Sequence, residues 1–183
     1  MCMIIGLTGT PGTGKTSVCR ILEAHGYRVI HMNELIKSEH LYSEVDKERD
    51  TVVADMDRVF SRVCELVGDD SDVTILDSHM AHHIADTVIV LRTAPSELTQ
   101  RLKARSYSES KVQENVEAEC LDVVLVESVE WCQKVYEVDT TGRMAEDVEE
   151  DVERIISGVL SGDDTLVYEQ YKPGSFDWSE EIF

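Results

Sequence analysis

The chain has 183 residues, of which 42% are hydrophobic and 30% charged, so it can bury one core and is neither disordered nor fibrous. Acidic residues outnumber basic ones by 37 to 17, which gives a net charge of -20. Such a surface repels phosphate backbones and anionic lipid, which argues against a membrane-bound protein and against an extended nucleic-acid surface. We expect a single domain that spans residues 1–183.

The predicted elements alternate between strands and helices along the chain. Short apolar runs rich in β-branched residues predict buried parallel strands at 3–8, 28–31, 73–77, 87–91 and 135–138. Apolar residues at helical spacing predict helices at 15–25, 56–67, 97–105, 112–131 and 146–160. This alternation is typical of an α/β fold with a doubly wound, five-stranded parallel sheet.

The first strand and the first helix flank a glycine-rich string, Gly9-Thr10-Pro11-Gly12-Thr13-Gly14-Lys15-Thr16. This is a complete Gly-x-x-x-x-Gly-Lys-Thr pattern, a P-loop, whose backbone N–H groups and helix N-terminus surround phosphate groups. For the ATP phosphates we expect contacts from Gly12, Thr13, Gly14, Lys15, Thr16 and Ser17. The Lys15 ammonium can reach the β and γ phosphates, and the Thr16 hydroxyl can ligate Mg²⁺.

An acidic residue follows the third predicted strand. Asp77 closes the run Val73–Asp77, at the carboxyl edge of the sheet where ligands of such folds bind, and it is the candidate Mg²⁺ ligand beside Thr16. His79 lies two residues further on and either positions a water or phosphate or is simply solvated. For His82 and His83 a polar loop is the favoured interpretation.

Two arginines occupy one face of the fourth predicted helix. Arg101 and Arg105 lie four residues apart, where the helix enters a polar loop. Phosphoryl transfer needs fixed cations around the transferred group, which favours Arg105 as a catalytic lid residue. A solvated cationic helix end is the alternative. No Asn-Lys-x-Asp motif is present, so a small kinase or a switch-like ATPase remains.

These separated motifs resemble the adenylate kinase isoenzyme six family of small nucleotide kinases, also described as ribosome-assembly factors. The resemblance rests on the P-loop, on Asp77-Ser78-His79, on the passage 91–107 and on 33–59. It implies a nucleoside-monophosphate arm at about 33–56 and a short lid at about 104–114. Two positions depart from the family pattern: Lys37 replaces an arginine that would clamp phosphate bidentately, and Ser106 replaces a glycine.

The resemblance also implies an activity and its residues. The reaction would be ATP + AMP to two ADP, with other monophosphates accepted and slower ATP hydrolysis. The implied catalytic residues are Lys15, Asp77, His79 and Arg105, with Arg105 also touching ATP. Asn33 and Lys37 would hold the monophosphate, and Thr16 and Asp77 the Mg²⁺. Residues 139–141 either contact the ATP base or cap the following helix.

A second implied function is assembly of the small ribosomal subunit and rRNA maturation, through a complex with a basic ribosomal protein. The distribution of charge favours this function, because residues 106–183 have a net charge of -16, against -4 for residues 1–105. Such an acidic portion complements a basic protein. A salt-adapted cytoplasm explains the same excess without a partner. The aromatic tail at 162–183 either packs on the protein's own core or docks a partner.

The five cysteines form no C-x-x-C pair and have no histidine spacing that suits zinc. Free, buried thiols in a reducing cytosol are therefore expected. The N-terminus has no basic segment typical of a signal peptide, and no apolar run approaches the ~18 residues that span a bilayer. These features predict a cytoplasmic protein.

Overall fold

The core is a five-stranded parallel sheet in the order β2-β5-β1-β6-β7. We describe it from a computed structural model, which describes residues 3–46, 51–68 and 73–179. The strands are β1 (Ile4–Thr8), β2 (Arg28–His31), β5 (Thr74–Asp77), β6 (Thr87–Arg92) and β7 (Lys134–Asp139). Each lies within one residue of its predicted bounds, and the doubly wound parallel sheet is confirmed.

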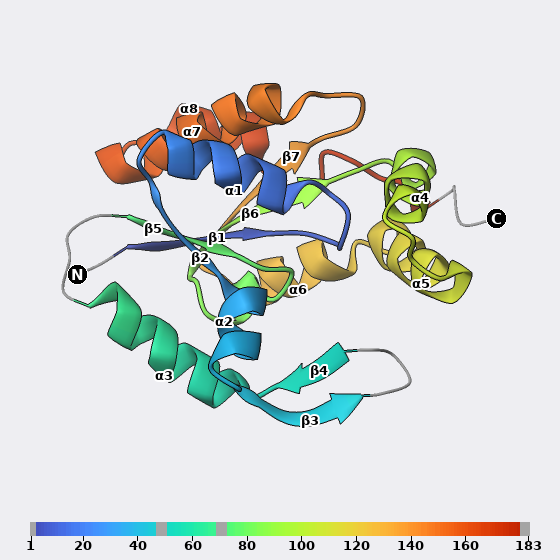
Figure 1. Cartoon of the computed structure of the whole chain (residues 1–183). Coiled ribbons are helices and arrows are strands. Elements are labelled where there is room, and N and C mark those ends of the chain that lie inside the picture. Colours follow the sequence, from blue (N-terminus) through green and yellow to red (C-terminus); the bar gives the residue numbers. More distant parts are fainter. Residues whose placement is uncertain (1–2, 47–50, 69–72, 180–183) are drawn as a thin grey trace.

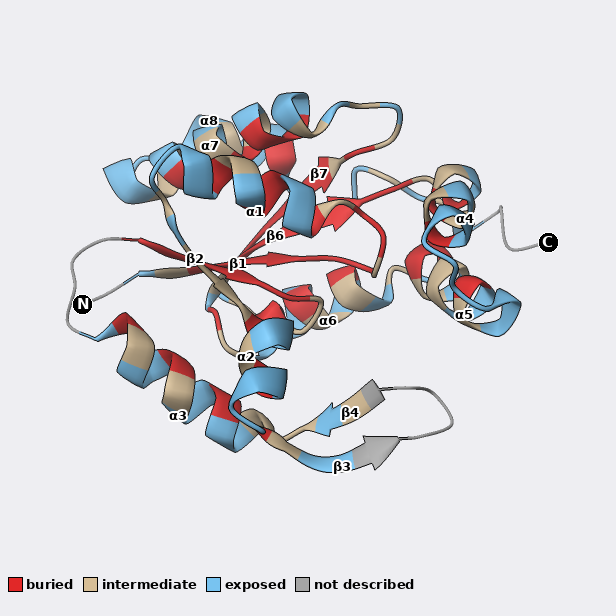
Figure 2. Cartoon of the chain, in the orientation of Figure 1, coloured by how far each residue is buried: buried red, intermediate tan, exposed pale blue. Residues whose placement is uncertain are grey.

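Helices cover both faces of the sheet (Figure 1). One face carries α1 (Lys15–Ala24), α7 (Ala145–Ser161) and α8 (Thr165–Tyr171). The other carries α2 (Met32–Ser38), α3 (Met56–Val67), the short η1 (Ala81–His83) and α6 (Val123–Trp131). Alternate residues of β6 serve the two layers: Ile89 packs with α1 and α7, whereas Val88 packs with α6. The sheet is buried throughout its centre (Figure 2).

The predicted helix at 112–131 is wrong, because two helices occupy this stretch. The first, α5 (Glu109–Cys120), pairs with α4 (Pro95–Ala104), and the second is α6. Asp122 has a positive φ of 55° between them. Its carboxylate and the Glu119 carbonyl both accept hydrogen bonds from Arg92. The turn therefore places two acceptors around the buried Arg92 guanidinium.

The segment at 33–56 has more regular structure than its polar sequence predicted. It contains most of α2 and an antiparallel hairpin of β3 (Tyr42–Asp46) and β4 (Thr51–Ala54). Met32 and Ile36, four residues apart, bury one face of α2. Residues 47–50, in the middle of this segment, lie outside the described residues.

The C-terminal tail packs on the protein's own core as far as it is described. Helix α8 ends at the buried Tyr171, and the Trp178 ring then lies 4.8 Å from the Arg92 guanidinium carbon. Phe183 and Cys2 lie outside the described residues. None of the four cysteines that the structure describes forms a disulfide, and Cys64 is exposed, so the expectation of buried thiols was wrong for it. None of the described helices is long and apolar enough to cross a membrane.

Candidate active site

The phosphate-binding loop connects β1 to α1 in a conformation that only glycine adopts easily. Gly9, Gly12 and Gly14 all have positive φ angles, of 131°, 101° and 100°. A Cβ on Gly9 would lie 2.3 Å from the carbonyl oxygen of Leu91, so the loop could not approach β6 with any other residue. The glycines therefore set the path of the P-loop, and α1 begins directly after Gly14.

Lys15 lies folded back over this loop. Its Nζ donates to the carbonyl oxygens of Gly9, at 2.6 Å, and Thr10, at 2.9 Å. Burial lowers the Lys15 pKa to about 8, against the opposing charges of Asp77 and Glu119. Within the described part of the chain its hydrogen-bond acceptors are these two neutral carbonyls, so the desolvated ammonium gains by meeting an anionic phosphate.

Thr16 and Asp77 lie side by side at the carboxyl edge of the sheet. The Thr16 Oγ1 donates to Asp77 Oδ2 at 3.1 Å, which brings together the two residues predicted to hold Mg²⁺. Thr16 is exposed, and Asp77 is only 7% exposed. A hydroxyl and a carboxylate are the hard oxygen ligands that Mg²⁺ prefers, so the pair fits this ion.

His31 is a member of this cluster that the sequence analysis missed. Its Nδ1 lies 2.8 Å from Asp77 Oδ2, and its Nε2 lies 3.5 Å from a carboxylate oxygen of Glu23. Although burial disfavours the imidazolium, the hydrogen bond and charge of Asp77, with Glu23, raise the His31 pKa. The available signal was the position of His31 at the end of a strand, at the same sheet edge as Asp77.

The three histidines that follow β5 have different surroundings. His79 is half-buried, and burial together with the charge of Lys15 lowers its pKa to about 4, which makes it a neutral imidazole at pH 7. His82 is buried in η1 against Trp131 and bonds Glu127 at 3.1 Å, so the prediction of a polar loop was wrong for it. His83 is exposed.

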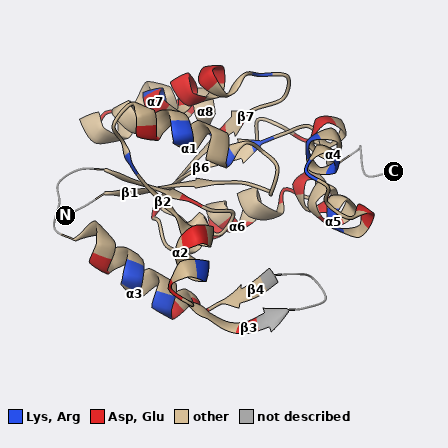
Figure 3. Cartoon of the chain, in the orientation of Figure 1, with Lys and Arg blue, Asp and Glu red and all other residues tan. Residues whose placement is uncertain are grey.

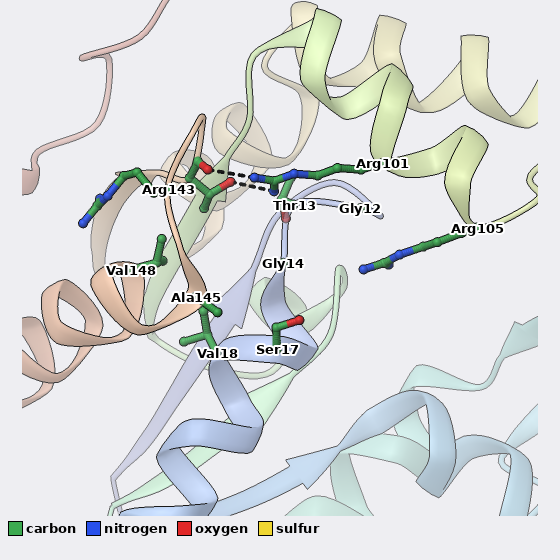
Figure 4. A pocket seen from close by; sticks show the side chains of 11 residues that line it. Gly12, Thr13, Gly14, Ser17, Val18, Arg101, Arg105, Arg143, Ala145 and Val148 are labelled. Atoms are coloured by element: carbon green, nitrogen blue, oxygen red, sulfur yellow. Dashed lines mark hydrogen bonds between the residues drawn. The ribbon is translucent and has the colours of Figure 1, made fainter.

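A cavity of about 190 Å³ opens beside the P-loop (Figure 4). Its lining combines loop backbone, small apolar side chains and arginines: Gly12, Thr13, Gly14, Ser17, Val18, Arg101, Arg105, Thr140, Arg143, Ala145 and Val148. The site therefore has a phosphate-binding end and a partly apolar end, the division that a nucleotide requires.

The three arginines of the cavity differ in how they are held. Arg101 bonds Glu97, at 2.5 Å, and the Thr140 carbonyl, at 2.8 Å. Arg143 bonds Asp151 at 2.8 Å and points away from the loop in Figure 4. Arg105 extends toward the P-loop and has no carboxylate partner within the described part of the chain. Of the three, Arg105 is the cation available to a ligand.

The loop after β7 contributes Thr140 to the cavity. Asp139 Oδ1 accepts from the backbone N–H of Thr141 at 2.9 Å, which folds the loop on itself. Helix α7 begins at Ala145 with Met144 as its N-cap and no side-chain capping bond. The alternative that residues 139–141 cap this helix is therefore wrong.

Asn33 and Lys37 lie apart from the cavity. Both are exposed on α2, which starts directly after β2 and so at the sheet edge that carries Asp77. The expected lid at 104–114 consists of the end of α4, a short turn and the first half of α5. Neither region contributes a lining residue except Arg105.

The comparisons with known proteins agree with this fold. A model of the family described as "AAA domain" matches residues 5–122. A protein named "Putative adenylate kinase" from Methanosarcina barkeri is 58% identical over 182 residues, which cover 98% of this chain and 100% of that protein. A protein of the same name from Archaeoglobus fulgidus is 42% identical over 98% of this chain and 94% of its own length.

Solved structures show the same fold at low identity. A shikimate kinase from Acinetobacter baumannii superposes with a TM-score of 0.60 at 16% identity, over 87% of this chain and 95% of that one. A second shikimate kinase, from Bacteroides thetaiotaomicron, gives a TM-score of 0.56 at 16% identity, over 85% and 98% of the two chains. The chain therefore belongs to the AAA-domain family of P-loop proteins and, within it, to the group of archaeal kinases to which the Methanosarcina and Archaeoglobus relatives belong.

Proposed function

We propose that this kinase transfers the γ-phosphoryl group of ATP to AMP, giving two ADP. It also accepts other nucleoside monophosphates and hydrolyses ATP slowly when no acceptor is bound. The observation that carries the proposal is the cavity beside the P-loop, which Arg105 lines. Lys15 lies over the same loop, and the Thr16–Asp77 pair lies where α1 begins, at the carboxyl edge of the sheet. The names of the relatives support AMP as the acceptor.

ATP binds with its phosphates in the P-loop and its nucleoside toward the apolar end of the cavity. There Val18, Ala145 and Val148 offer an apolar surface and Thr140 offers polar atoms. Lys15 exchanges the carbonyls of Gly9 and Thr10 for the β and γ phosphates. The buried ammonium then compensates phosphate charge.

Thr16 and Asp77 are the residues that hold Mg²⁺. When bound with ATP, this ion neutralises phosphate charge and supports the developing charge of the transfer. His31 keeps the Asp77 carboxylate in place through its 2.8 Å contact. His79, neutral at pH 7, is able to accept or donate a hydrogen bond near Lys15 without adding charge.

Arg105 meets the charge that develops on the transferred group. In-line transfer breaks the bond between the γ phosphorus and the bridging oxygen and forms a bond to an oxygen of the acceptor phosphate. It needs positioning and fixed cations rather than a protein nucleophile. Arg105 lies at the end of α4, beside the turn to α5, where a small movement of the helix pair shifts its guanidinium.

Asn33 and Lys37 bind the acceptor from α2. The acceptor approaches from the side of α2 and the β3–β4 hairpin, opposite α7 (Figure 1). Lys37 neutralises a phosphate but offers no planar fork, so we expect a weaker grip on AMP than an arginine gives.

The kinase proposal is tested by a coupled assay of the purified protein with Mg-ATP and each nucleoside monophosphate. ADP should form with AMP well above the rate of ATP hydrolysis alone, and Lys15→Ala should abolish both reactions while the protein remains folded. A folded wild-type protein with no transfer above hydrolysis would contradict the proposal.

A second proposed function is ATP-dependent assembly with a basic ribosomal protein during rRNA maturation. Two surface features support it. Asp and Glu gather on α7 and α5 (Figure 3), and α6 with its entry exposes the apolar side chains of Leu121, Val123, Val126, Val129 and Trp131. The acidic helix α5 contacts α6 and so lies next to this apolar strip, and such a surface suits a basic protein better than RNA.

The two functions are separated by affinity capture of ribosomal proteins with and without ATP. A basic small-subunit protein that is retained in one nucleotide state and released in the other would support assembly. Recovery of no ribosomal protein in either state would leave the metabolic kinase alone.

A further inference from the structure

A buried ionic cluster surrounds Arg92 at the end of β6. This residue is 1% exposed, and its guanidinium bonds Glu119 at 2.8 Å, Glu137 at 2.6 Å and the carboxylate of Asp122. Three carboxylates around one cation are hard to bury unless each is held by further hydrogen bonds. Glu119 has a further hydrogen-bond partner in the P-loop, and Glu137 has one in the C-terminal tail.

Glu119 connects the cluster to the P-loop. Its Oε2 accepts the hydroxyl of Thr10, the second residue of the loop, and its Oε1 accepts the backbone N–H of Thr93 at 3.1 Å. The Thr10 carbonyl in turn accepts Lys15 Nζ at 2.9 Å. The charge of Glu119 also opposes the loss of the Lys15 proton, although burial lowers the Lys15 pKa to about 8.

The tail covers the other side of the cluster. Trp178 lies over the Arg92 guanidinium, with 4.8 Å between the guanidinium carbon and the ring centroid. The Ser175 backbone N–H donates to Glu137 Oε2 at 2.8 Å, and Phe176 stacks on Trp178 at 6.0 Å. A tryptophan face over a desolvated guanidinium is a favourable cation–π contact.

We propose that the tail at residues 172–179 positions the P-loop through the chain of contacts Trp178, Arg92, Glu119 and Thr10. If Arg92 moved away from Glu119 or Glu137, a buried charge would be left without a partner. A change at Trp178 that displaces Arg92 therefore also displaces Glu119, and with it the Thr10 hydroxyl that Glu119 accepts. By linkage, nucleotide binding and tail docking then stabilise each other. Arg92 and Glu119 are positioning residues, and the kinetic part of the proposal rests on the proposed kinase function.

The first test is spectroscopic and needs no catalysis. The chain has two tryptophans, so in a Trp131→Phe background Trp178 alone reports on the tail. Saturation with a non-hydrolysable ATP analogue should change the Trp178 emission, and an added Thr10→Val substitution should remove the change although the analogue still binds. Binding seen by calorimetry with no change of emission in the Trp131→Phe protein would overturn the coupling.

The second test is kinetic. Trp178→Ala should lower kcat/KM for ATP by about three- to tenfold with an unchanged KM for AMP, and Trp178→Phe, which keeps a ring, should restore most of it. Trp131→Ala removes an exposed tryptophan outside the cluster and should leave both parameters as they are. Equal effects of Trp178→Ala and Trp131→Ala on these parameters, or an equal weakening of KM for ATP and for AMP in Trp178→Ala, would count against the proposal.

The two proposals fail in different ways. If the wild-type protein binds ATP but transfers no phosphoryl group, the kinase function fails, and the emission of Trp178 still decides whether the tail and the P-loop are coupled. If transfer proceeds normally in Trp178→Ala and the emission never responds, only the coupling fails.

Discussion

Nδ1 of His31 lies 2.8 Å from Oδ2 of Asp77, the same carboxylate oxygen that accepts the hydroxyl of Thr16 at 3.1 Å. The contact exists because β2 and β5 are parallel neighbours and both residues end their strands in register. His31 therefore orients the carboxylate that we propose as an Mg²⁺ ligand.

Removal of this imidazole should weaken the Mg²⁺ dependence of the kinase more than its folding. In His31→Ala we expect the Mg²⁺ concentration for half-maximal activity to rise about tenfold, because supporting hydrogen bonds orient metal ligands. His83→Ala, at an exposed histidine, serves as the control. Titration of activity with Mg²⁺ at saturating ATP measures the effect, and coincident curves for His31→Ala and wild type would show that His31 has no such role.

Arg105 and Arg101 should respond differently to alanine. Arg105→Ala should reduce kcat by about 100-fold with little change in ATP affinity, because its contact belongs to the transition state. Arg101 instead joins Glu97 to the Thr140 carbonyl, so Arg101→Ala should lower the free energy of unfolding by about 1 to 2 kcal/mol. Steady-state kinetics with ATP calorimetry and urea unfolding distinguish the two. A loss of ATP affinity in Arg105→Ala as large as its loss of kcat would contradict the lid role.

Gly12 needs both its backbone angle and the absence of a side chain. With a φ of 101°, an added Cβ would lie 2.8 Å from Leu98 and 2.9 Å from Leu102 on α4. Gly26 has a similar φ of 95° and nothing within 4 Å of its added Cβ, so Gly26→Ala measures backbone strain alone.

We expect Gly26→Ala to lower the free energy of unfolding by about 1 kcal/mol, and Gly12→Ala to lower it by about 2 kcal/mol. ATP binding should weaken in Gly12→Ala only. Urea unfolding and ATP calorimetry of the two variants test this. Equal stability and equal ATP affinity in both would mean that the contact with α4 is unimportant.

His82 should make the protein less stable in acid. Burial, with the charge of His83, lowers the His82 pKa below its ordinary 6.5, against the opposing effect of Glu127. Below about pH 6.5 His82 is protonated in the unfolded chain but still neutral in the folded chain, so the free energy of unfolding falls as the pH falls.

His82→Gln keeps a hydrogen-bond donor for Glu127 and cannot ionise, so it should flatten this decline between about pH 7 and 5. His83→Gln removes the neighbouring charge that helps to lower the His82 pKa, so it should flatten the slope only in part. Urea unfolding at a series of pH values gives the slopes, and a wild-type slope in His82→Gln would assign the acid sensitivity to other groups.

The sheet and the P-loop were predictable because their signals are local. The run Gly9–Thr16 needs only its own glycines and its flanking strand and helix, and each strand was a short β-branched run. Asp77 followed from the rule that ligands gather at the carboxyl edge of a parallel sheet. The helix predicted at 112–131 failed because the signal to turn at Asp122 comes from Arg92, 30 residues away.

Local chemistry in the sequence thus determined the fold class and the phosphate site, since backbone conformation and apolar periodicity act over a few residues. The tertiary structure alone decided which distant side chains support that site: His31 reaches Asp77 through adjacent strands, and Glu119 reaches Thr10 across 109 residues. The physical reason is that a buried charge needs hydrogen-bond partners to offset its desolvation, and only the packed fold decides which residues lie close enough to be those partners.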